Sequence, residues 1–497
     1  MLFNSIDFIL FFPVVAFLYF VMPRRLKSLW LLGASYYFYM CWNAGYLLLI
    51  LFSTIVTYGC GCLLERAGRL PDEHRKILYR KCCVAGSLVI NLSILFLFKY
   101  YSFAAANVQS LLQYTGISIK LPAVDLLLPV GISFYTFQAL GYTIDVYRER
   151  IAAEKNFIQY ALFVSFFPQL VAGPIERAGN LLSQLREAHR FDYARAREGL
   201  LIMIWGYFLK LVLADRIAII VNTVYGAYET YTGMYLVVAT VLFAFQIYCD
   251  FAGYSIIALG AAKIMGFTLM ENFDAPYLSC SVAEFWRRWH ISLSSWFKDY
   301  LYIPLGGSRK GQVRKYINVL IVFCVSGLWH GAGWTFVIWG GLNGLYQIVG
   351  ALCRPLRERL VKLFHLHPHS LANRMASALF TFFLVDVSWL FFRAETIGHA
   401  LAIVKSICTV HNPWILFDGS LYELGLSMKS FQVMVVSLVL LMAADVMKYK
   451  GICIRKILLE QDYWFRYLVF AGSILLITLV GVWGVGFEES GFIYFQF

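Results

Sequence analysis

His330 is the side chain whose type and setting best suit it to chemistry. It lies within the uncharged stretch Tyr316–Cys353, between tryptophans and beside glycines that let another backbone or a substrate come close. An imidazole can move protons near neutral pH because its unperturbed pKa is about 6.5. In an apolar pocket, desolvation favours the neutral form that a general base requires. If Gly331–Gly333 forms a turn, this role needs the turn to be recessed within the protein. Catalysis and a buried, hydrogen-bonded histidine remain equal alternatives.

His290 lies in a second unusual stretch, Phe285–Leu305. Large apolar side chains recur there at steps of three and four, which is one helical stripe: Trp286, Trp289, Leu293, Trp296 and Tyr300. The other faces carry Arg287, Arg288 and His290. We therefore predict a helix in the cytoplasmic membrane interface, with its indoles at headgroup depth and its basic side chains toward phosphates. On such a helix His290 either takes part in chemistry or faces solvent and headgroups.

Charged residues inside apolar runs are the next candidates, because a charge at the centre of a bilayer costs about 2.5–3.5 kcal/mol on insertion scales. They are Lys210, Asp215, Asp250, Asp386 and Asp445. Lys210 and Asp215 are five residues apart, which is not the favoured helical spacing, so we expect them to pair with other helices. Asp386 and Asp445 are either functional groups or polar contacts that hold helices together.

The segment Phe166–Glu176 has two prolines, Pro168 and Pro174, with Gly173 just before the second. We predict that it is not an uninterrupted helix. Broken backbone at membrane depth survives only where protein or a water-filled cavity surrounds it, so we expect this segment to line something. No metal site is predicted, because a chance grouping of His365, His367 and His369 is favoured over a ligand set.

These residues belong to a chain whose composition is that of a membrane protein. Of its 497 residues, 60% are hydrophobic and only 14% charged, against about 45–50% and about 25% in soluble chains. Runs without charge recur that are long enough to span a bilayer. They are Ser28–Leu64, Thr230–Cys249, Tyr316–Cys353 and Tyr467–Phe487. We predict one all-α polytopic membrane domain over residues 1–497, and the same numbers exclude disordered, fibrous and disulfide-scaffold classes.

The net charge of +13 does not indicate nucleic acid, because basic residues alternate with apolar runs instead of sharing one surface. They gather in Arg24–Lys27, Arg66–Lys81, Arg148–Lys155, Arg177–Arg197, Lys263–Lys315, Arg354–Arg374 and Lys448–Arg466. Cytoplasmic loops retain excess Lys and Arg, so all of these segments are predicted to face the cytoplasm. About 12 spans in the cell membrane then follow, with turns at Trp42–Gly45 and Gly331–Gly333 and both termini outside.

Several motifs, in order along nearly the whole chain, resemble the membrane-bound O-acyltransferase (MBOAT) family. They are Glu284–His290, Tyr302–Gly307 and Trp329–Gly331, joined by Pro168–Ile175 and Tyr248–Ser255, which match the family's bacterial branch. Within that branch the chain is most similar to proteins of alginate and other cell-envelope polysaccharide O-acetylation. Ile256 departs from the pattern, since acetylation members often have an acid at that place.

The resemblance implies a bundle of about 12 spanning helices with re-entrant and interfacial helices. It implies that His330 is catalytic and that His290 is a second catalytic candidate. For substrate binding it points to Trp329, Asp250, Arg287, Arg288, Pro168 and Gln169, with Arg309 and Lys310 also suited to donor phosphates. It implies no bound cofactor and a cytoplasmic acyl thioester, acetyl-CoA, as donor. The acceptor is a hydroxyl of an extracytoplasmic polysaccharide or of a partner protein.

A separate partner is expected because no GxSxG nucleophile elbow occurs in the sequence. The resemblance suggests a secreted or membrane-anchored, hydrolase-like acetyltransferase. Two alternatives remain: D-alanyl transfer toward teichoic acid, and a non-enzymatic transporter that uses Lys210, Asp250 and Asp386 as a coupling path. The identity of the polysaccharide, the direct acceptor and the oligomeric state stay open.

The predicted topology can be tested at Asp418, in a connection expected to face outward. An engineered Asp418→Cys should react with a membrane-impermeant maleimide in intact cells, above the background of the parent protein. Labelling that requires prior permeabilisation of the membrane would overturn the assigned orientation.

Overall fold

The computed structural model describes residues 1–117, 121–122, 128–171, 173–365, 367, 370–483 and 492–493. All regular structure in these ranges is helical, with no strand. The chain divides into two compact units, one of Met1–Leu200 with Ala258–Met270 and one of Leu201–Ile257 with Glu271–Phe497. That residues 1–497 act as a single domain stays a prediction.

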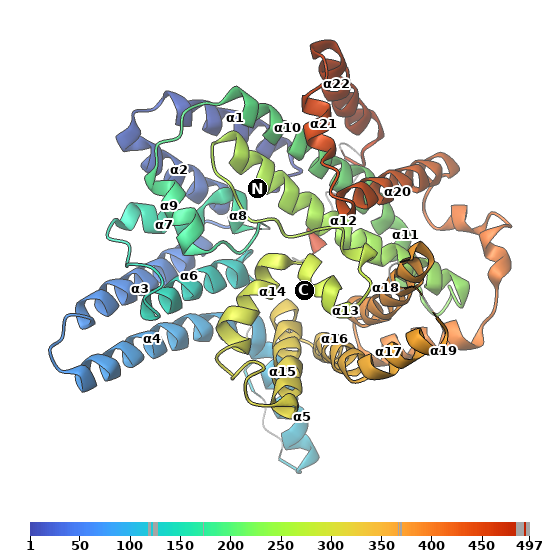
Figure 1. Ribbon diagram of the computed structural model, residues 1–497, viewed down its shortest axis with the longest axis horizontal. Helices are drawn as coiled ribbons and strands as arrows, with labels where there is room; N and C mark the ends of the chain where they lie inside the picture. Colours follow the sequence, from blue (N-terminus) through green and yellow to red (C-terminus); the bar gives the residue numbers. More distant parts are fainter. Residues whose placement is uncertain are drawn as a thin grey trace. The chain divides into compact units, whose positions relative to one another are not determined.

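The first unit contains a group of side-by-side helices in which α3, α4 and α6 pack together (Figure 1). Its helices are α1 (Ile6–Val21), α2 (Arg24–Met40), α3 (Tyr46–Ala67), α4 (Glu73–Leu95), α5 (Tyr101–Tyr114), α6 (Ile132–Tyr147), α7 (Phe157–Ser165), α8 (Phe167–Leu170) and α9 (Ala178–Arg186). Two further helices, α10 (Tyr193–Tyr207) and α12 (Met234–Ile264), contribute residues to both units.

The second unit contains both histidines singled out above. Its helices are α11 (Asp215–Gly226), α13 (Val282–Arg288), α14 (Ile291–Phe297), α15 (Gln312–His330), α16 (Trp334–Leu352), α17 (Arg354–Leu363), α18 (Leu371–Arg393), α19 (Ile397–Thr409), α20 (Met428–Tyr449), α21 (Ile454–Leu459) and α22 (Tyr463–Val480). Short π-helical segments occur at Phe96–Tyr100, in the first unit, and at Phe208–Ala214 and Lys298–Tyr302, in the second.

Seven helical segments in the described ranges are long and apolar enough to cross a membrane. They are Tyr46–Ala67, Glu73–Tyr114, Met234–Ile264, Trp334–Leu352, Leu371–Arg393, Met428–Tyr449 and Tyr463–Val480. Shorter apolar helices accompany them. The all-α multi-pass membrane class is therefore confirmed. The two predicted turns are also confirmed, since α2 and α3 flank Trp42–Gly45 and α15 and α16 flank Gly331–Gly333. The number of about 12 spans stays a prediction.

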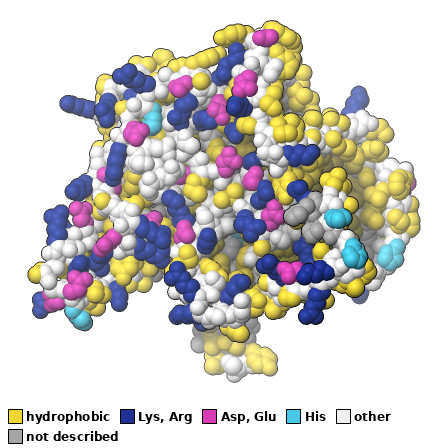
Figure 2. Space-filling view, in the orientation of Figure 1, with side chains coloured by type: hydrophobic (Ala, Val, Ile, Leu, Met, Phe, Trp, Pro, Cys, Tyr) yellow, Lys and Arg dark blue, Asp and Glu magenta, His cyan; other side chains and the backbone are white. Residues whose placement is uncertain are grey.

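Contacts between basic segments fit the predicted orientation. Within each unit, these segments are joined to one another by hydrogen bonds, ion pairs or cation–π contacts, and Figure 2 shows basic and acidic side chains intermixed on the visible face. In the first unit the pairs are Lys27–His189, Arg80–Glu149, Glu154–Arg186 and Arg195–Thr268, and in the second they are Lys448–Glu271 and Arg374–Tyr449. Segments in contact near their charged ends share one side of the membrane, as the orientation requires.

The prediction of one continuous helix over Phe285–Leu305 is wrong. Helix α13 ends at Arg288 and α14 begins at Ile291, because His290 between them has φ 44° and ψ 55°, in the left-handed region. The indole-bearing residues Trp286, Trp289 and Trp296 are buried among protein side chains, which contradicts headgroup depth. Steps of three and four fit a buried helical face as well as an interfacial one, so periodicity alone did not separate the two.

Two glycines set the packing of α15 against α16. A Cβ on Gly327 would lie 2.1 Å from the carbonyl oxygen of Phe336, and one on Gly340 would lie 2.2 Å from that of Phe323. No side chain fits at these distances, so both positions require glycine. Small residues at a crossing let membrane helices approach at backbone distance. This contact fixes the end of α15, where His330 is the last helical residue.

Candidate active site

His330 lies in an aromatic shell built by three helices of the second unit. Its ring centroid is 4.9 Å from Trp329, 5.0 Å from Trp339 on α16 and 5.6 Å from Phe392 on α18, each edge to face. The side chain is 3% exposed, so the turn after α15 is recessed, as a catalytic role requires. Rings in this arrangement restrict the imidazole to one place and exclude bulk water from its faces.

His290 lies directly beside His330, with 6.4 Å between the two ring centroids. It is fully buried, and its ring stands edge to face on Phe251 of α12 at 4.6 Å. Burial lowers the pKa of His290 to about 3, so this imidazole is neutral at physiological pH. The expectation of a headgroup-facing or solvated side chain is therefore wrong. The structure brings together the two histidines that the sequence placed 40 positions apart.

The break that positions His290 is held by Asn272, which the sequence analysis did not single out. Its backbone oxygen accepts from Ile291 N at 3.0 Å, and its Oδ1 accepts from Ser292 Oγ at 2.7 Å. Its Nδ2 donates to Ser255 Oγ on α12 at 3.1 Å. The bond from Ile291 N, and a longer one from Ser292 N to Asn272 Oδ1 at 3.3 Å, satisfy backbone donors at the start of α14 that a helix leaves unpaired. Asn272 lies in the irregular segment before α13, where no periodic pattern marks it.

A second buried amide supports the aromatic shell. Asn343 on α16 accepts from the Trp286 indole N–H at 3.1 Å and donates from its Nδ2 to Ser388 Oγ on α18 at 3.2 Å. It thereby links α13, α16 and α18. The sequence feature that could have identified Asn343 is its position within the uncharged run Tyr316–Cys353, because a buried amide has to be hydrogen-bonded. Trp329 is 3% exposed and contacts both histidine rings, with its ring centroid 6.0 Å from His290 and 4.9 Å from His330.

Lys210 forms a buried ion triad with Asp215 and Asp250. Its Nζ lies 2.8 Å from Asp215 Oδ1 and 2.6 Å from Asp250 Oδ1. The expectation that Lys210 pairs with another helix is confirmed by Asp250 on α12. The expectation that it does not pair with Asp215 is wrong, because Phe208–Ala214 is π-helical. A π-helix bonds residue i to i+5, and Asp215 N accordingly donates to Lys210 O. Residues five apart then share one face.

Asp250 also holds the described piece of the C-terminal segment. Its Oδ2 accepts from Ile493 N at 2.7 Å. The preceding ring, Phe492, packs on Tyr254 at 4.7 Å and on Phe251 at 5.7 Å. Since Phe251 contacts His290, this carboxylate supports the wall of the histidine pair. The structure thus places Asp250 in a supporting network, and a contact with substrate stays a prediction.

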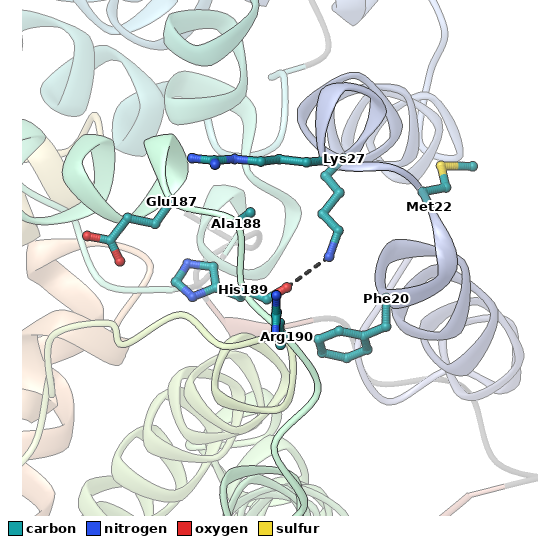
Figure 3. Close-up of a pocket in the computed structure, with 8 residues that line it drawn as sticks. Phe20, Met22, Lys27, Glu187, Ala188, His189 and Arg190 are labelled. Atoms are coloured by element: carbon teal, nitrogen blue, oxygen red, sulfur yellow. Dashed lines mark hydrogen bonds between the residues drawn. The ribbon is translucent and has the colours of Figure 1, made fainter.

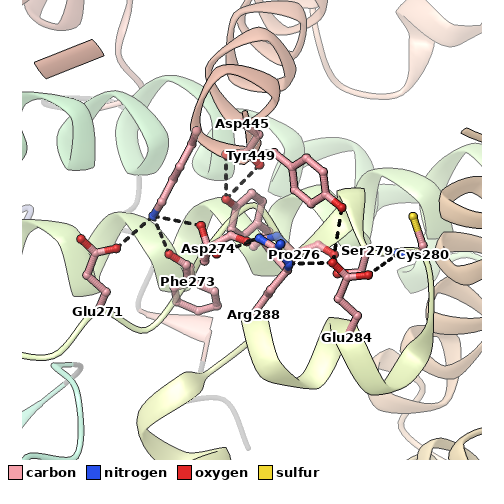
Figure 4. A network of polar contacts seen from close by, with 12 residues as sticks. Glu271, Phe273, Asp274, Pro276, Ser279, Cys280, Glu284, Arg288, Asp445 and Tyr449 are labelled. Atoms are coloured by element: carbon pink, nitrogen blue, oxygen red, sulfur yellow. Dashed lines mark hydrogen bonds and ion pairs between the residues drawn. The ribbon is translucent and has the colours of Figure 1, made fainter. Parts of the chain in front are cut away.

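The four cations considered for donor phosphates have different surroundings. Arg287, Arg309 and Lys310 are exposed. Arg288 is instead part of an ion-pair network, with Nη1 2.7 Å from Asp274 Oδ2 and Nε 3.1 Å from Glu284 Oε1 (Figure 4). The two carboxylates therefore compete with a donor phosphate for the Arg288 guanidinium.

The same network ties the segment before α13 to α20. Lys448 Nζ donates to Glu271 Oε2 at 3.0 Å and to Phe273 O at 2.8 Å, and the Tyr449 hydroxyl reaches Glu284 (Figure 4). Nearby, Asp445 accepts from the Tyr248 hydroxyl, so this buried acid is a polar contact between α20 and α12. The assignment of Asp386 stays open.

Pro168 and Gln169 belong to the first unit. The predicted interruption is confirmed, because α7 ends at Ser165 and α8 covers only Phe167–Leu170. Gln169 is buried and donates from Nε2 to Phe163 O at 2.8 Å. A part for Pro168 and Gln169 in substrate binding stays a prediction.

Metal ligands do not cluster within the described part of the chain, where no group of three His, Cys, Asp or Glu residues could hold an ion. Of the histidine cluster, His365 and His367 are described and His369 lies outside the described residues.

Two neighbouring buried histidines lie among the helices of a multi-pass membrane protein, an arrangement that suits an enzyme embedded in the membrane. The MBOAT, membrane-bound O-acyltransferase family matches residues 35–385. The chain belongs to this family, and it is an acyltransferase of the cell membrane.

Three relatives show which members of the family this chain resembles. The chain is 36% identical over 420 residues to the probable alginate O-acetylase of Azotobacter vinelandii, covering 84% of this chain and 80% of the relative. It is 33% identical over 439 residues to the peptidoglycan O-acetyltransferase of Helicobacter pylori, covering 82% and 80%. The teichoic acid D-alanyltransferase of Bacillus subtilis is more distant, at 26% over 289 residues, 56% of this chain and 72% of the relative.

The ion triad gives a stability prediction. Lys210→Met leaves Asp215 and Asp250 buried without their cation, which costs about 3–5 kcal/mol for a buried pair. We expect a clearly lower melting temperature of the purified protein in detergent. The matched control is Lys405→Met, which removes an exposed lysine from α19 and should leave the melting temperature unchanged. Equal melting temperatures for the two variants would contradict the triad.

Proposed function

We propose that this protein transfers an acetyl group from acetyl-CoA, a cytoplasmic thioester, toward a hydroxyl on the opposite side of the membrane. The hydroxyl belongs to a cell-envelope polysaccharide or to a partner protein that passes the group on. The observation that carries the proposal is the pair of buried histidines in an aromatic shell. The names of the alginate and peptidoglycan relatives support acetyl as the group and a polysaccharide as the final acceptor.

His330 is the general base of this proposal. It takes the proton of the hydroxyl while the hydroxyl oxygen attacks the thioester carbonyl, so that a C–O bond forms and the C–S bond breaks. The same proton then passes from the imidazolium to the leaving thiolate, which restores neutral His330. A positioned base of this kind contributes about 10²–10⁴ in rate.

His290 is the orienting group. A neutral imidazole has one donor and one acceptor nitrogen, and burial keeps His290 in that form. From its place beside His330 it can fix the direction of the reacting hydroxyl or of the carbonyl oxygen. The exposed side chains of Arg287, Arg309 and Lys310 suit the donor's phosphates, since guanidinium and ammonium groups bind phosphate by charge-assisted hydrogen bonds.

A partner completes the proposal. Where the acceptor is a partner protein, we propose a secreted or membrane-anchored, hydrolase-like acetyltransferase, and the absence of a GxSxG elbow from this sequence fits a separate partner. D-alanyl transfer toward teichoic acid is the second candidate, and the similarity to the more distant Bacillus subtilis relative favours it.

The test is transfer of radiolabelled acetyl from acetyl-CoA in membranes that carry either the wild type or His330→Ala. Loss of the base should reduce transfer about 10²-fold or more. His399→Ala is the matched control, because the ring of His399 on α19 packs on Tyr228 and is not one of the rings that surround the histidine pair, so this variant should retain full transfer. Undiminished transfer by a folded His330→Ala protein would reject the assignment. Replacing acetyl-CoA by a D-alanyl carrier protein in the same membranes separates the two candidate donors.

A further inference from the structure

A cavity of about 520 Å³ opens in the first unit, and none of the residues that line it belongs to the candidate active site (Figure 3). It lies between the α1–α2 connection and the segment that follows α9. Both of these segments are among the basic segments predicted to face the cytoplasm. A cavity of this size is large enough for a phosphate group together with part of the molecule that carries it.

The lining of this cavity is strongly cationic. Arg24, Lys27 and Arg190 contribute three positive charges, and Glu187 contributes the one carboxylate. Figure 3 shows the Glu187 carboxylate directed away from the Lys27 ammonium. Among the described residues, no acidic side chain forms an ion pair with Arg24, Lys27 or Arg190. Three cations and one carboxylate leave the lining with a net positive charge, which favours a bound anion.

Lys27 is held in place within the cavity. Its Nζ donates to the backbone oxygen of His189 at 2.8 Å and lies 4.7 Å from the centroid of the Tyr19 ring. An ammonium group has three donors, so this bond leaves capacity for a ligand. Partial burial and the charge of Arg190 lower the pKa of Lys27, which lies outside the candidate membrane spans. An anion bound between Lys27 and Arg190 would raise the pKa of Lys27 again.

The opposite wall of the cavity is fixed by close packing. The His189 Nε2 lies 3.0 Å from Gln184 O, and its ring stands on Phe267 at 4.6 Å. Gly266 has φ 98°, and a Cβ there would lie 2.7 Å from the His189 Cβ, so glycine is required for this approach. The His189 carbonyl, which orients Lys27, is therefore held in position before any ligand binds. Such preorganisation reduces the entropy lost on binding.

An apolar rim borders the basic groups. Phe20 and Met22 line the cavity at the end of α1, and Phe17 and Val21 on the same helix are 66% and 65% exposed. Basic groups beside exposed apolar side chains are the arrangement that meets phospholipid headgroups at a membrane surface.

We propose that this cavity is a binding site for a phosphate group, held by Lys27, Arg190 and Arg24. The phosphate belongs to the headgroup of an acidic phospholipid or to a soluble phosphate ester. The apolar rim favours the phospholipid.

The test measures the melting temperature of the purified protein in detergent, because a ligand that binds only the folded state raises it. Phosphatidylglycerol, phosphatidylcholine and inorganic phosphate are titrated separately against the wild type and against a Lys27→Gln/Arg190→Gln variant. Arg25→Gln is the matched control, since Arg25 is an exposed neighbour that does not line the cavity. The ligand concentration for half-maximal shift should rise at least tenfold in the double variant and less than twofold in the control.

The outcomes separate the two sources. A shift with phosphatidylglycerol alone, lost in the double variant, supports a lipid headgroup, and an equally sensitive shift with inorganic phosphate supports a site for phosphate itself. Should the double variant fail to fold, the exposed Arg190→Gln alone replaces it. The proposal is overturned if no ligand shifts the wild type, if both lipids act equally, or if wild type and variant respond alike.

Discussion

Backbone contact between α15 and α16 at Gly327 and Gly340 is the constraint on which the candidate active site depends. The approach leaves no room for a Cβ on either glycine, so it fixes how the end of one helix meets the start of the next. His330 is the last residue of α15, and Trp339 on α16 forms part of its shell. Any change in this crossing moves the histidine relative to the rings that surround it.

Buried polar contacts then attach the remaining walls. Asn272 holds the break at His290, Asn343 links three helices through Trp286 and Ser388, and the Lys210 triad anchors Asp250. Inside an apolar bundle such groups are costly unless they are paired, so each pairing specifies one arrangement of helices. The catalytic proposal rests on this rigidity, because a general base works only when it is held within hydrogen-bond reach of its proton.

Sequence patterns predicted the membrane class, the turn between α15 and α16, the break after Ser165 and a buried place for His330. They failed where local geometry departed from regular helix. The π-helical turn at Phe208–Ala214 brings Lys210 and Asp215 together, and the left-handed backbone of His290 ends a helix that the spacing of tryptophans had extended. Neither conformation has a periodic signature, since both depend on contacts from residues distant in sequence.

The most direct measurement compares acetyl transfer by Gly340→Ala and Gly341→Ala, two neighbouring substitutions on α16. A Cβ at Gly341 meets only Cys324 Sγ at 3.9 Å, whereas one at Gly340 meets a backbone oxygen at 2.2 Å. The account predicts a loss of about 10²-fold in transfer per folded molecule for Gly340→Ala, since misplacement by about 1 Å has that effect. Gly341→Ala should match the wild type. Wild-type transfer by folded Gly340→Ala would contradict the account.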